Sequence, residues 1–345
     1  MGILSDHFIS GINSLFLSVL NSNLYTRKII GKLGEPYLAG HSLEEGLENI
    51  VKHYQEQQRY STFDILGEEA AAAQDVAQYL NAYSQTLDFI GNNFPYGDSP
   101  RNRPASLSVK PSTICLAVKS DSTVSINETT PLARQVEILA ARAQKNGLDL
   151  TIDMEDHRWT DATLEAAQHV WKSGYDNLGI VLQSRLYRTQ RDIVDRIIVP
   201  HYPFPKENLR VRSCIGVYRE SRTIATRNKK EMKERLWRRL EELFNTGVYV
   251  EIATHDHQLV HRLIDELILP GHYPPTRYEF QFLKGVYNGE KLGQELRAAG
   301  HTVRDYMPVE LHDGDGTPYM FRRLKANPEL LVNGMKNMVQ KIFKR

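Results

Sequence analysis

Hydrophobic and polar residues follow two different patterns along the chain, and the pattern changes near residue 100. Segments 43–58 and 66–93 are rich in Glu, Gln, Ala and Leu with helical periodicity, and no convincing strand precedes residue 100. Residues 93–104 cluster Pro, Gly, Asn and Asp, which is typical of a linker or a long loop. We therefore predict a helical N-terminal region over residues 1–100 and a second domain over residues 105–345.

Beyond residue 105, short apolar runs alternate with longer amphipathic segments. Segments 131–145, 160–173, 228–245 and 256–268 are long enough for crossover helices. The apolar runs, which we predict to be strands, are 106–110, 148–153, 178–183, 209–214, 248–253, 278–283 and 302–307. Repeated βα units imply a parallel sheet. Seven strands, with an eighth that the pattern does not place, favour an α/β fold of the closed, TIM-like (β/α)8 type over an open doubly wound sheet.

Composition and short motifs narrow the class of protein. The chain has 345 residues, of which 41% are hydrophobic and 25% charged, with a net charge of +1. This is typical of a soluble globular protein and gives no indication of nucleic-acid binding. Cys115 and Cys214 lack the spacing of a zinc site or a disulfide framework, so we expect a reducing, cytoplasmic compartment. Residues 8–20 read as an amphipathic helix and not as a signal peptide. Neither a dinucleotide-binding glycine motif nor a P-loop is present.

Polar residues gather where the predicted strands end. In a barrel the catalytic residues collect on this face, because the βα loops meet there. The strand ends contribute Lys110, Asp153 with Glu155 and Asp156, Gln183, Arg212 with Tyr218, Thr254 with His255, Glu279 with Gln281, and Arg304 with Tyr306. Each of these residues also has a purely structural interpretation, such as an ion pair between Lys110 and Asp153 or a loop cap by Glu279.

A tyrosine and two arginines are spaced for one helix face near the C-terminus. Arg322 and Arg323 follow Tyr319 by three and four residues, so the three side chains can converge on one small volume. Two adjacent guanidinium groups repel each other unless an anion lies between them, and each matches the geometry of a carboxylate. The alternative is a solvated basic helix end, since Lys325 follows closely.

The motifs, taken in order, resemble those of the proline dehydrogenase family over roughly residues 105–327. The most specific are Tyr278 to Leu283 and the Tyr-x-x-Arg-Arg-Leu motif that begins at Tyr319. The others are Val109-Lys110, Thr151 to Asp156, Gln183, Val211-Arg212 with Gly216 to Tyr218, Ala253 to Asp256, and Val303 to Tyr306. The resemblance implies a distorted (β/α)8 barrel that holds FAD at its mouth. It also implies oxidation of L-proline to Δ1-pyrroline-5-carboxylate by hydride transfer from C5 to flavin N5.

The resemblance also implies roles for individual residues. Arg322 and Arg323 would bind the substrate carboxylate, while Tyr218, Tyr306 and Tyr319 would shape the pocket around the ring. Lys110 and Asp153 would form a buried pair on the substrate side, and Arg212 would lie beside flavin N5. The other residues expected in the flavin-binding shell are Gln183, Thr254, His255 and Glu279.

Partners follow from the same resemblance. Relatives of this size generally pass electrons to membrane quinones, and a separate pyrroline-5-carboxylate dehydrogenase would take over the product. The amphipathic N-terminus, together with basic residues of the C-terminus, would suit contact with the inner face of a membrane, although their composition favours a packed helix and a solvated tail. These basic residues are Lys336, Lys341, Lys344 and Arg345.

Three departures from the family pattern leave alternatives open. Ile215 stands where a lysine is usual, Arg185 where an aromatic residue is common, and residues 309–312 replace a glycine-containing turn. The alternatives are oxidation of a substituted cyclic amino acid such as hydroxyproline, and a flavin-free barrel that binds an amino acid. A third is a metal-dependent barrel enzyme with four candidate ligands, namely Asp153, Glu155, Asp156 and His255.

Overall fold

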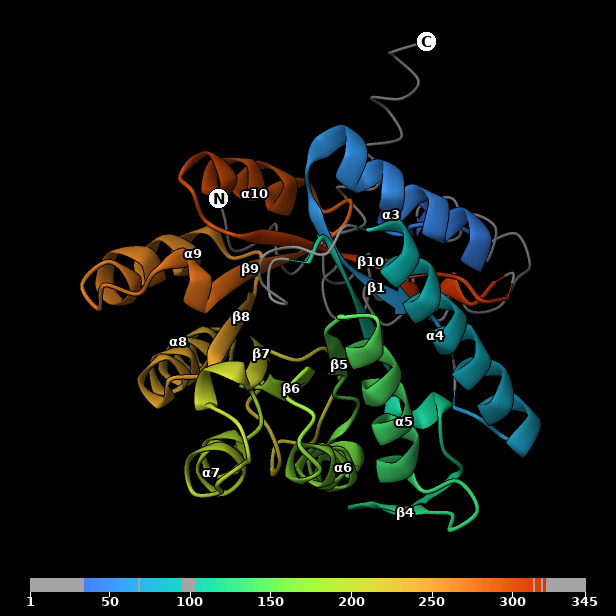
Figure 1. The fold of residues 1–345 in the computed structure, drawn as a ribbon. Coiled ribbons are helices and arrows are strands. Elements are labelled where there is room, and N and C mark those ends of the chain that lie inside the picture. The colour runs from blue at the N-terminus through green and yellow to red at the C-terminus, as the bar shows by residue number, and fades with distance from the viewer. Residues whose placement is uncertain (1–33, 68, 95–102, 313, 318, 321–345) are drawn as a thin grey trace, which may run out of the picture.

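The computed structural model describes residues 34–67, 69–94, 103–312, 314–317 and 319–320. Eight parallel strands close into a barrel in the order β1-β10-β9-β8-β7-β6-β5-β2, and helices surround them (Figure 1). The barrel strands are β1 Tyr60–Ile65, β2 Ala105–Val109, β5 Leu150–Ile152, β6 Leu178–Gln183, β7 Arg210–Cys214, β8 Tyr249–Ala253, β9 Tyr278–Leu283 and β10 Val303–Val309. The predicted (β/α)8 barrel is confirmed, and its seven predicted strands form at the expected places.

Six of the helices that cover the barrel match the predicted amphipathic segments, whereas α7 Thr189–Ile193 and α10 Tyr287–Ala298 were not predicted. The six are α3 Leu43–Gln57, α4 Ala73–Asn93, α5 Leu132–Lys145, α6 Thr160–Lys172, α8 Lys229–Thr246 and α9 His257–Leu263. The helices α7 and α9 continue into π-helical turns over Val194–Ile198 and Ile264–Ile268. A small antiparallel pair, β3 Ala117–Lys119 with β4 Val124–Ile126, follows β2.

The eighth strand is β1, and it lies in the part of the chain that was predicted to be free of strands. Thr62 of β1 pairs in register with Ser106 of β2 on one side and Tyr306 of β10 on the other. The prediction that no strand precedes residue 100 is therefore wrong. The barrel begins at Tyr60, and α4 is the first crossover helix and not part of a separate helical region.

Each helix presents an apolar face to the barrel. In α5, for example, Val136, Leu139, Ala140 and Ala143 are buried at the spacing of one helix face. The helix α3 lies so close to the barrel that its Gly46 has no room for a side chain. A Cβ there would come within 2.4 Å of Val309. The core thus lies between the helices and the outer surface of the strands.

The inside of the barrel is polar. Residues that point inward include the charged side chains of Asp64, Arg210, Arg212, Glu251 and Glu279, all of them buried. Burying a charge is costly unless it is paired and hydrogen-bonded. The interior is therefore a connected network of ion pairs, and the charges at its carboxyl end form the candidate site.

Candidate functional site

Asp153 is the centre of a hydrogen-bond network at the carboxyl end of the barrel. It follows β5 directly, and its Oδ1 accepts hydrogen bonds from Arg212 Nη1 at 2.9 Å and Ser108 Oγ at 3.2 Å. Its Oδ2 accepts from the Tyr306 hydroxyl at 2.6 Å. One carboxylate just after β5 thereby joins residues of β2, β7 and β10, as expected if these polar residues converge.

Lys110 forms its ion pair with Asp64 of β1. The Lys110 ammonium contacts Asp64 Oδ1 and also donates to the carbonyl oxygen of Ile65 at 3.2 Å. The predicted ion pair between Lys110 and Asp153 is wrong, because the ammonium pairs instead with Asp64 of β1, the strand that the sequence pattern missed. Burial opposes the charge of Lys110, but the carboxylates of Asp64 and Asp153 outweigh it and raise the pKa of the ammonium.

Tyr306 keeps its proton in this environment. Burial is the largest cause, and the carboxylates of Asp153 and Asp64 add to it, so the pKa of the phenol lies well above its usual range. The guanidinium of Arg212 lies 5.3 Å from the centre of the Tyr306 ring, within range of a cation–π contact. Tyr306 therefore acts as a hydrogen-bond donor to Asp153 and as a fixed wall of the site.

Arg212 is held on three sides. Its Nε donates to Glu251 Oε2 at 3.2 Å, and its Nη1 donates to Asp153 and Ser108. Its Nη2 is buried and has no hydrogen-bond partner among the described residues. Burial works against the charge, but Glu251 and Asp153 more than compensate and raise the pKa of Arg212. The site therefore contains a permanent positive charge, and the Nη2 nitrogen of Arg212 remains available as a hydrogen-bond donor.

Gln183, at the end of β6, has a similar unused group. Its Nε2 donates to the carbonyl oxygen of Glu155 at 2.6 Å, whereas its buried Oε1 has no partner among the described residues. Gly216, in the loop after β7, has a φ of +102°, and a Cβ there would lie 2.3 Å from that oxygen. Only glycine fits this approach. The neighbouring strands β6 and β7 thus offer one unpaired acceptor atom and one unpaired donor nitrogen, which fits a planar polar heterocycle such as a flavin.

Thr254 and His255, the two residues predicted for a flavin-binding shell, directly follow β8. Thr254 is buried, and its Oγ1 accepts a hydrogen bond from the backbone N–H of Asp256 at 3.3 Å. His255 Nε2 accepts from the backbone N–H of Leu283 at 2.9 Å, so the imidazole links the ends of β8 and β9. The structure therefore places both residues at the mouth, with His255 held in a fixed orientation.

Glu279 does not lie at the mouth. It is the second residue of β9, fully buried in the amino-terminal half of the barrel. Its carboxylate accepts from Arg304 Nε at 2.8 Å, Gln281 Nε2 at 2.6 Å and the Tyr249 hydroxyl at 3.3 Å. The prediction that Glu279 stands at a strand end is wrong, because polar residues line this strand along its length and not only at its end.

The tyrosines that were predicted to shape the ring pocket lie at the same end of the barrel as Asp153. Tyr319 is buried in an apolar cluster with Tyr37, Leu66 and Leu283, and Tyr306 packs against this cluster. Tyr218 follows β7, and its carbonyl oxygen accepts from Arg185 Nη1 at 2.9 Å. Arg322 and Arg323 lie outside the described residues.

The residues that depart from the family pattern make contacts within the described part of the structure. Arg185 is buried, and it donates to the carbonyl oxygens of Tyr218 and Thr226, so it braces the loop after β7. Glu310, just after β10, accepts from the backbone N–H of Gly316 at 2.7 Å and contacts His41 Nδ1 at 2.6 Å. Ile215 packs at the edge of the hydrophobic core.

The metal-dependent alternative is not supported by the described residues. Asp153 is engaged by Arg212 and Tyr306, and Glu155 accepts from both the backbone N–H and the hydroxyl of Ser112. Asp156 caps the turn at His157–Trp159 and pairs with Arg158. The four proposed ligands do not converge on one point in the described part of the chain.

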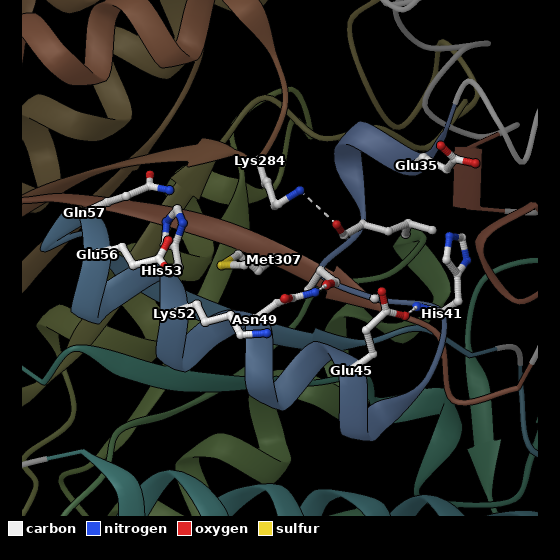
Figure 2. Close-up of a pocket in the computed structure, with 13 residues that line it drawn as sticks. Glu35, His41, Glu45, Asn49, Lys52, His53, Glu56, Gln57, Lys284 and Met307 are labelled. Atoms are coloured by element: carbon white, nitrogen blue, oxygen red, sulfur yellow. Dashed lines mark hydrogen bonds between the residues drawn. The ribbon is translucent and has the colours of Figure 1, made fainter. Parts of the chain in front are cut away.

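A groove of about 460 Å³ lies elsewhere on the molecule. It runs along α3, and its lining includes His41, Lys52, His53, Lys284 and Met307 (Figure 2). Lys284 donates from Nζ to the carbonyl oxygens of Pro36 and Leu38, both at 2.9 Å. None of the predicted site residues lines this groove, so it is separate from the network around Asp153.

Three residues of the site were missed by sequence reasoning. Asp64 was missed together with β1, and Ser108 and Glu251 were passed over as ordinary strand residues. Glu251 pairs with both Arg210 and Arg212. Burial raises the pKa of its carboxyl, but the two arginines and other neighbours outweigh burial, so that the pKa is lowered. The available signal was a polar or charged residue at every second position, as at Thr62 and Asp64 in β1 or Ser106 and Ser108 in β2, which indicates a polar barrel interior.

None of the described helices has an apolar stretch long enough to cross a bilayer.

The comparisons with known proteins point to one family. The family model for proline dehydrogenase matches residues 47–199 and 228–331. Proline dehydrogenase 2 of Bacillus subtilis strain 168 is 26% identical over 339 residues, which cover 98% of this chain and 100% of that protein. Proline dehydrogenase of Deinococcus radiodurans is 27% identical over 315 residues, covering 90% of this chain and 92% of the relative.

A solved structure shows the same fold. It is that of proline utilization A from Bdellovibrio bacteriovorus, inactivated by N-propargylglycine, with a TM-score of 0.73 and 19% identity. The match covers 86% of this chain and 32% of that larger protein.

Proposed function

The chain belongs to the proline dehydrogenase family, and from that premise we propose that its flavin is FAD, bound at the carboxyl end of the barrel. As a member of the family it is an oxidoreductase that oxidises proline in the first step of proline catabolism. The family is flavin-dependent in general. When bound, the flavin supplies the acceptor for the hydride that leaves proline C5.

One observation carries the assignment of the flavin site, namely the two unpaired polar atoms on the neighbouring strands β6 and β7. Arg212 Nη2 and Gln183 Oε1 are buried without partners among the described residues. Buried polar groups are normally hydrogen-bonded, so these atoms call for a ligand with both a donor and an acceptor. We propose that Arg212, Gln183, Thr254 and His255 hold the flavin. Glu279 is left out of this proposal, because Arg304, Gln281 and Tyr249 already occupy its oxygens.

The remaining groups at the mouth orient the substrate. Asp153 fixes both Tyr306 and Arg212, so the ring wall and the positive charge keep a constant relative position. Lys110, whose charge is neutralised by Asp64, joins β2 to the end of β1 beside them. Such preorganisation lowers the barrier, because the side chains do not have to rearrange when the reaction begins.

We propose Arg322 and Arg323 as the ligands of the substrate carboxylate. Both lie outside the described residues, so the proposal rests on the sequence motif and on the position of Tyr319. Tyr319 packs at the mouth beside Tyr306, three and four residues before the two arginines. A planar fork that donates two parallel hydrogen bonds is the side chain best matched to a carboxylate.

Replacing Arg322 with Met tests the carboxylate assignment. We expect kcat/KM for L-proline to fall by roughly 10- to 150-fold, because a hydrogen bond to a charged group contributes about 1.5–3 kcal/mol. Flavin content, measured from the visible spectrum of the purified variant, should be unchanged. A variant with normal kcat/KM would contradict the assignment, and a variant without flavin would mean that Arg322 serves the cofactor instead.

The experiment that tests the function itself is the visible spectrum of the purified protein before and after anaerobic addition of L-proline. We expect a flavin band that bleaches with L-proline and stays unchanged with L-alanine, which has no ring. Release of the flavin by denaturation and chromatography against FAD and FMN then identifies it. Bleaching only by hydroxyproline would move the substrate to a substituted ring, and the absence of a flavin band even after added FAD would contradict the cofactor.

We propose further that a quinone reoxidises the flavin at the inner face of a membrane. A separate pyrroline-5-carboxylate dehydrogenase would then take over the product, because the cyclic imine hydrolyses to an aldehyde that a second oxidation can consume. Turnover with a short-chain quinone analogue tests the first part. Sedimentation with lipid vesicles tests the second, and a protein that neither turns over with quinones nor binds vesicles would contradict the proposed acceptor and location.

A further inference from the structure

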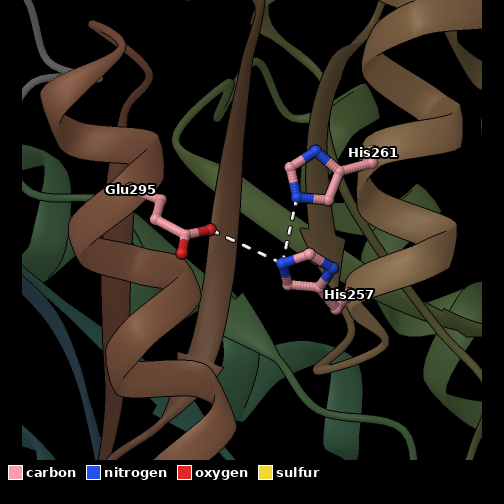
Figure 3. Close-up of side chains that lie close together, drawn as sticks. All are labelled: His257, His261 and Glu295. Carbon is pink, nitrogen blue, oxygen red and sulfur yellow. Dashed lines mark hydrogen bonds and ion pairs between the residues drawn. The ribbon is translucent and has the colours of Figure 1, made fainter.

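Two histidines and a glutamate converge on the outer surface of the barrel. His257 and His261 stand one turn apart on α9, and Glu295 faces them from the last turn of α10 (Figure 3). The Nε2 atoms of the two histidines are 3.1 Å apart, and His257 Nε2 lies 3.5 Å from Glu295 Oε2. All three potential ligand atoms lie within 4.8 Å of one another.

The two shorter separations, 3.1 and 3.5 Å, are close to those of ligands around a tetrahedral metal ion. With metal–nitrogen and metal–oxygen bonds of about 2.0–2.2 Å, tetrahedral ligands lie roughly 3.3–3.6 Å apart. The imidazole rings are inclined to each other by 52° and so are not stacked face to face. Their nitrogen atoms point toward a common volume that the Glu295 carboxylate also borders. Little movement is therefore needed for all three to coordinate one ion.

The charged residues next to this cluster on α9 are paired with other groups and do not compete for the volume between the three side chains. Asp256 accepts from the backbone N–H of Leu259 at 3.0 Å and pairs with Lys233 at 2.5 Å, so its carboxylate is occupied. Arg262, the nearest arginine along α9, pairs with Glu234 and Glu266. The start of α9 is thus fixed by its cap, and its two histidines are presented on one face.

We propose that His257, His261 and Glu295 form a binding site for Zn²⁺, with water as the fourth ligand. Two imidazoles and one carboxylate are a ligand set that suits Zn²⁺ among the divalent ions, and hard ions such as Mg²⁺ require more oxygen ligands. The ion would link α9 to α10, which follow neighbouring strands of the barrel. The site lies apart from the network around Asp153 and does not depend on the proposed flavin.

Calorimetric titration of the full-length, flavin-loaded protein with ZnCl₂ tests the site. We compare the wild type with H257Q, H261Q and E295Q. Each change should weaken this binding event by at least about tenfold, because even residues outside the coordination shell cost about 10- to 100-fold when removed. The matched control is H169Q, since His169 is an exposed helical histidine that faces one glutamate, Glu137, at 3.8 Å. H169Q should bind as the wild type does, and isotherms that are identical for all variants would overturn the proposal.

Thermal unfolding gives a second readout that does not depend on activity. Zn²⁺ should raise the Tm of the wild type and of H169Q, because an ion that binds only the folded state stabilises it. The H257Q/H261Q double variant should unfold at the wild-type Tm without metal and lose the increase with Zn²⁺. A chelator should reverse the increase, and Mg²⁺ should not produce it. An undiminished increase in the double variant would overturn the proposal.

Discussion

The pair of Lys110 and Asp64 shows how a single residue decides the cost of a buried charge. Lys110 is mostly shielded from solvent, and Asp64 is almost completely so. An ion pair in such surroundings contributes little net stability, but removing one partner leaves the other charge without compensation. Asp64 therefore determines whether the amino group of Lys110 can be accommodated at the mouth at all.

Replacing Asp64 with Asn should destabilise the protein by about 3–5 kcal/mol, because it leaves the Lys110 ammonium buried without a counterion. Urea unfolding followed by far-UV circular dichroism measures this change. The double variant D64N/K110M, which removes both charges, should recover most of the loss. If the double variant is no more stable than D64N, then the loss arises from packing and not from the unpaired charge.

Replacing Tyr306 with Phe should lower kcat/KM by roughly 10- to 150-fold, because the hydrogen bond to the Asp153 carboxylate is lost while the ring remains. The pKa of Tyr306 is raised well above its usual range, so the phenol stays protonated throughout the neutral and mildly alkaline range. We expect flavin reduction to accelerate with pH as the substrate amine loses its proton. Y306F should keep that rise, measured by stopped-flow absorbance between pH 7 and pH 10. The exposed Y187F is the control, and loss of the rise in Y306F alone would contradict this interpretation.

At the scale of elements, His41 and Glu310 join the approach to α3 to the segment after β10. The hydrogen bond to Glu310 is the largest cause of the raised pKa of His41, and burial acts against it. A raised pKa in the folded state means that this contact stabilises the protein fully below the pKa of the unfolded histidine, about 6.5. The contribution is lost as pH rises through the folded value.

H41Q should therefore cost more stability at pH 5.5 than at pH 9. Because the His41 side chain is half exposed, solvent screens the pair, and we expect a difference under about 1 kcal/mol. Urea unfolding at the two pH values measures it. An equal cost at both values, or a larger cost at pH 9, would show that the protonated histidine does not contribute.

Sequence patterns identified most of the barrel but not β1, and the reason is physical. In β1, Thr62 and Asp64 point into the polar interior, while only Phe63 and Ile65 provide apolar contact outside. Helical segments on both sides of it made the first hundred residues look uniformly helical. Its place in the sheet is set by pairing with β10, more than two hundred residues away, which local periodicity does not encode.

The candidate site was predicted in part for the same reason. The strand ends did bring Asp153, Arg212 and Tyr306 together, because parallel strands end on one face of a barrel. The partner of Lys110 depended on the missed strand. Glu279 was misplaced because a strand that lines a charged interior carries polar residues in both halves, so polarity alone does not mark the carboxyl end.

At the scale of the whole molecule, a chain that begins at residue 105 should not fold. It lacks β1, so β2 and β10 lose their common neighbour and the barrel stays open with two unpaired edges. Lys110 also loses Asp64. We expect this fragment to be insoluble or to unfold without a cooperative transition, as measured by circular dichroism on heating beside the full chain. A fragment that unfolds cooperatively and retains flavin would show that β1 is dispensable.

The pairing of the first barrel strand with the last has a consequence for synthesis on the ribosome. At roughly 5–20 residues per second, the chain between Ile65 and Val303 takes about 12 to 50 s to emerge. During that interval one edge of β1 has no permanent neighbour, and the carboxylate of Asp64 can stay hydrated. Closure is therefore a late event, and a chaperone that shields open sheet edges would act on the nascent protein within this interval.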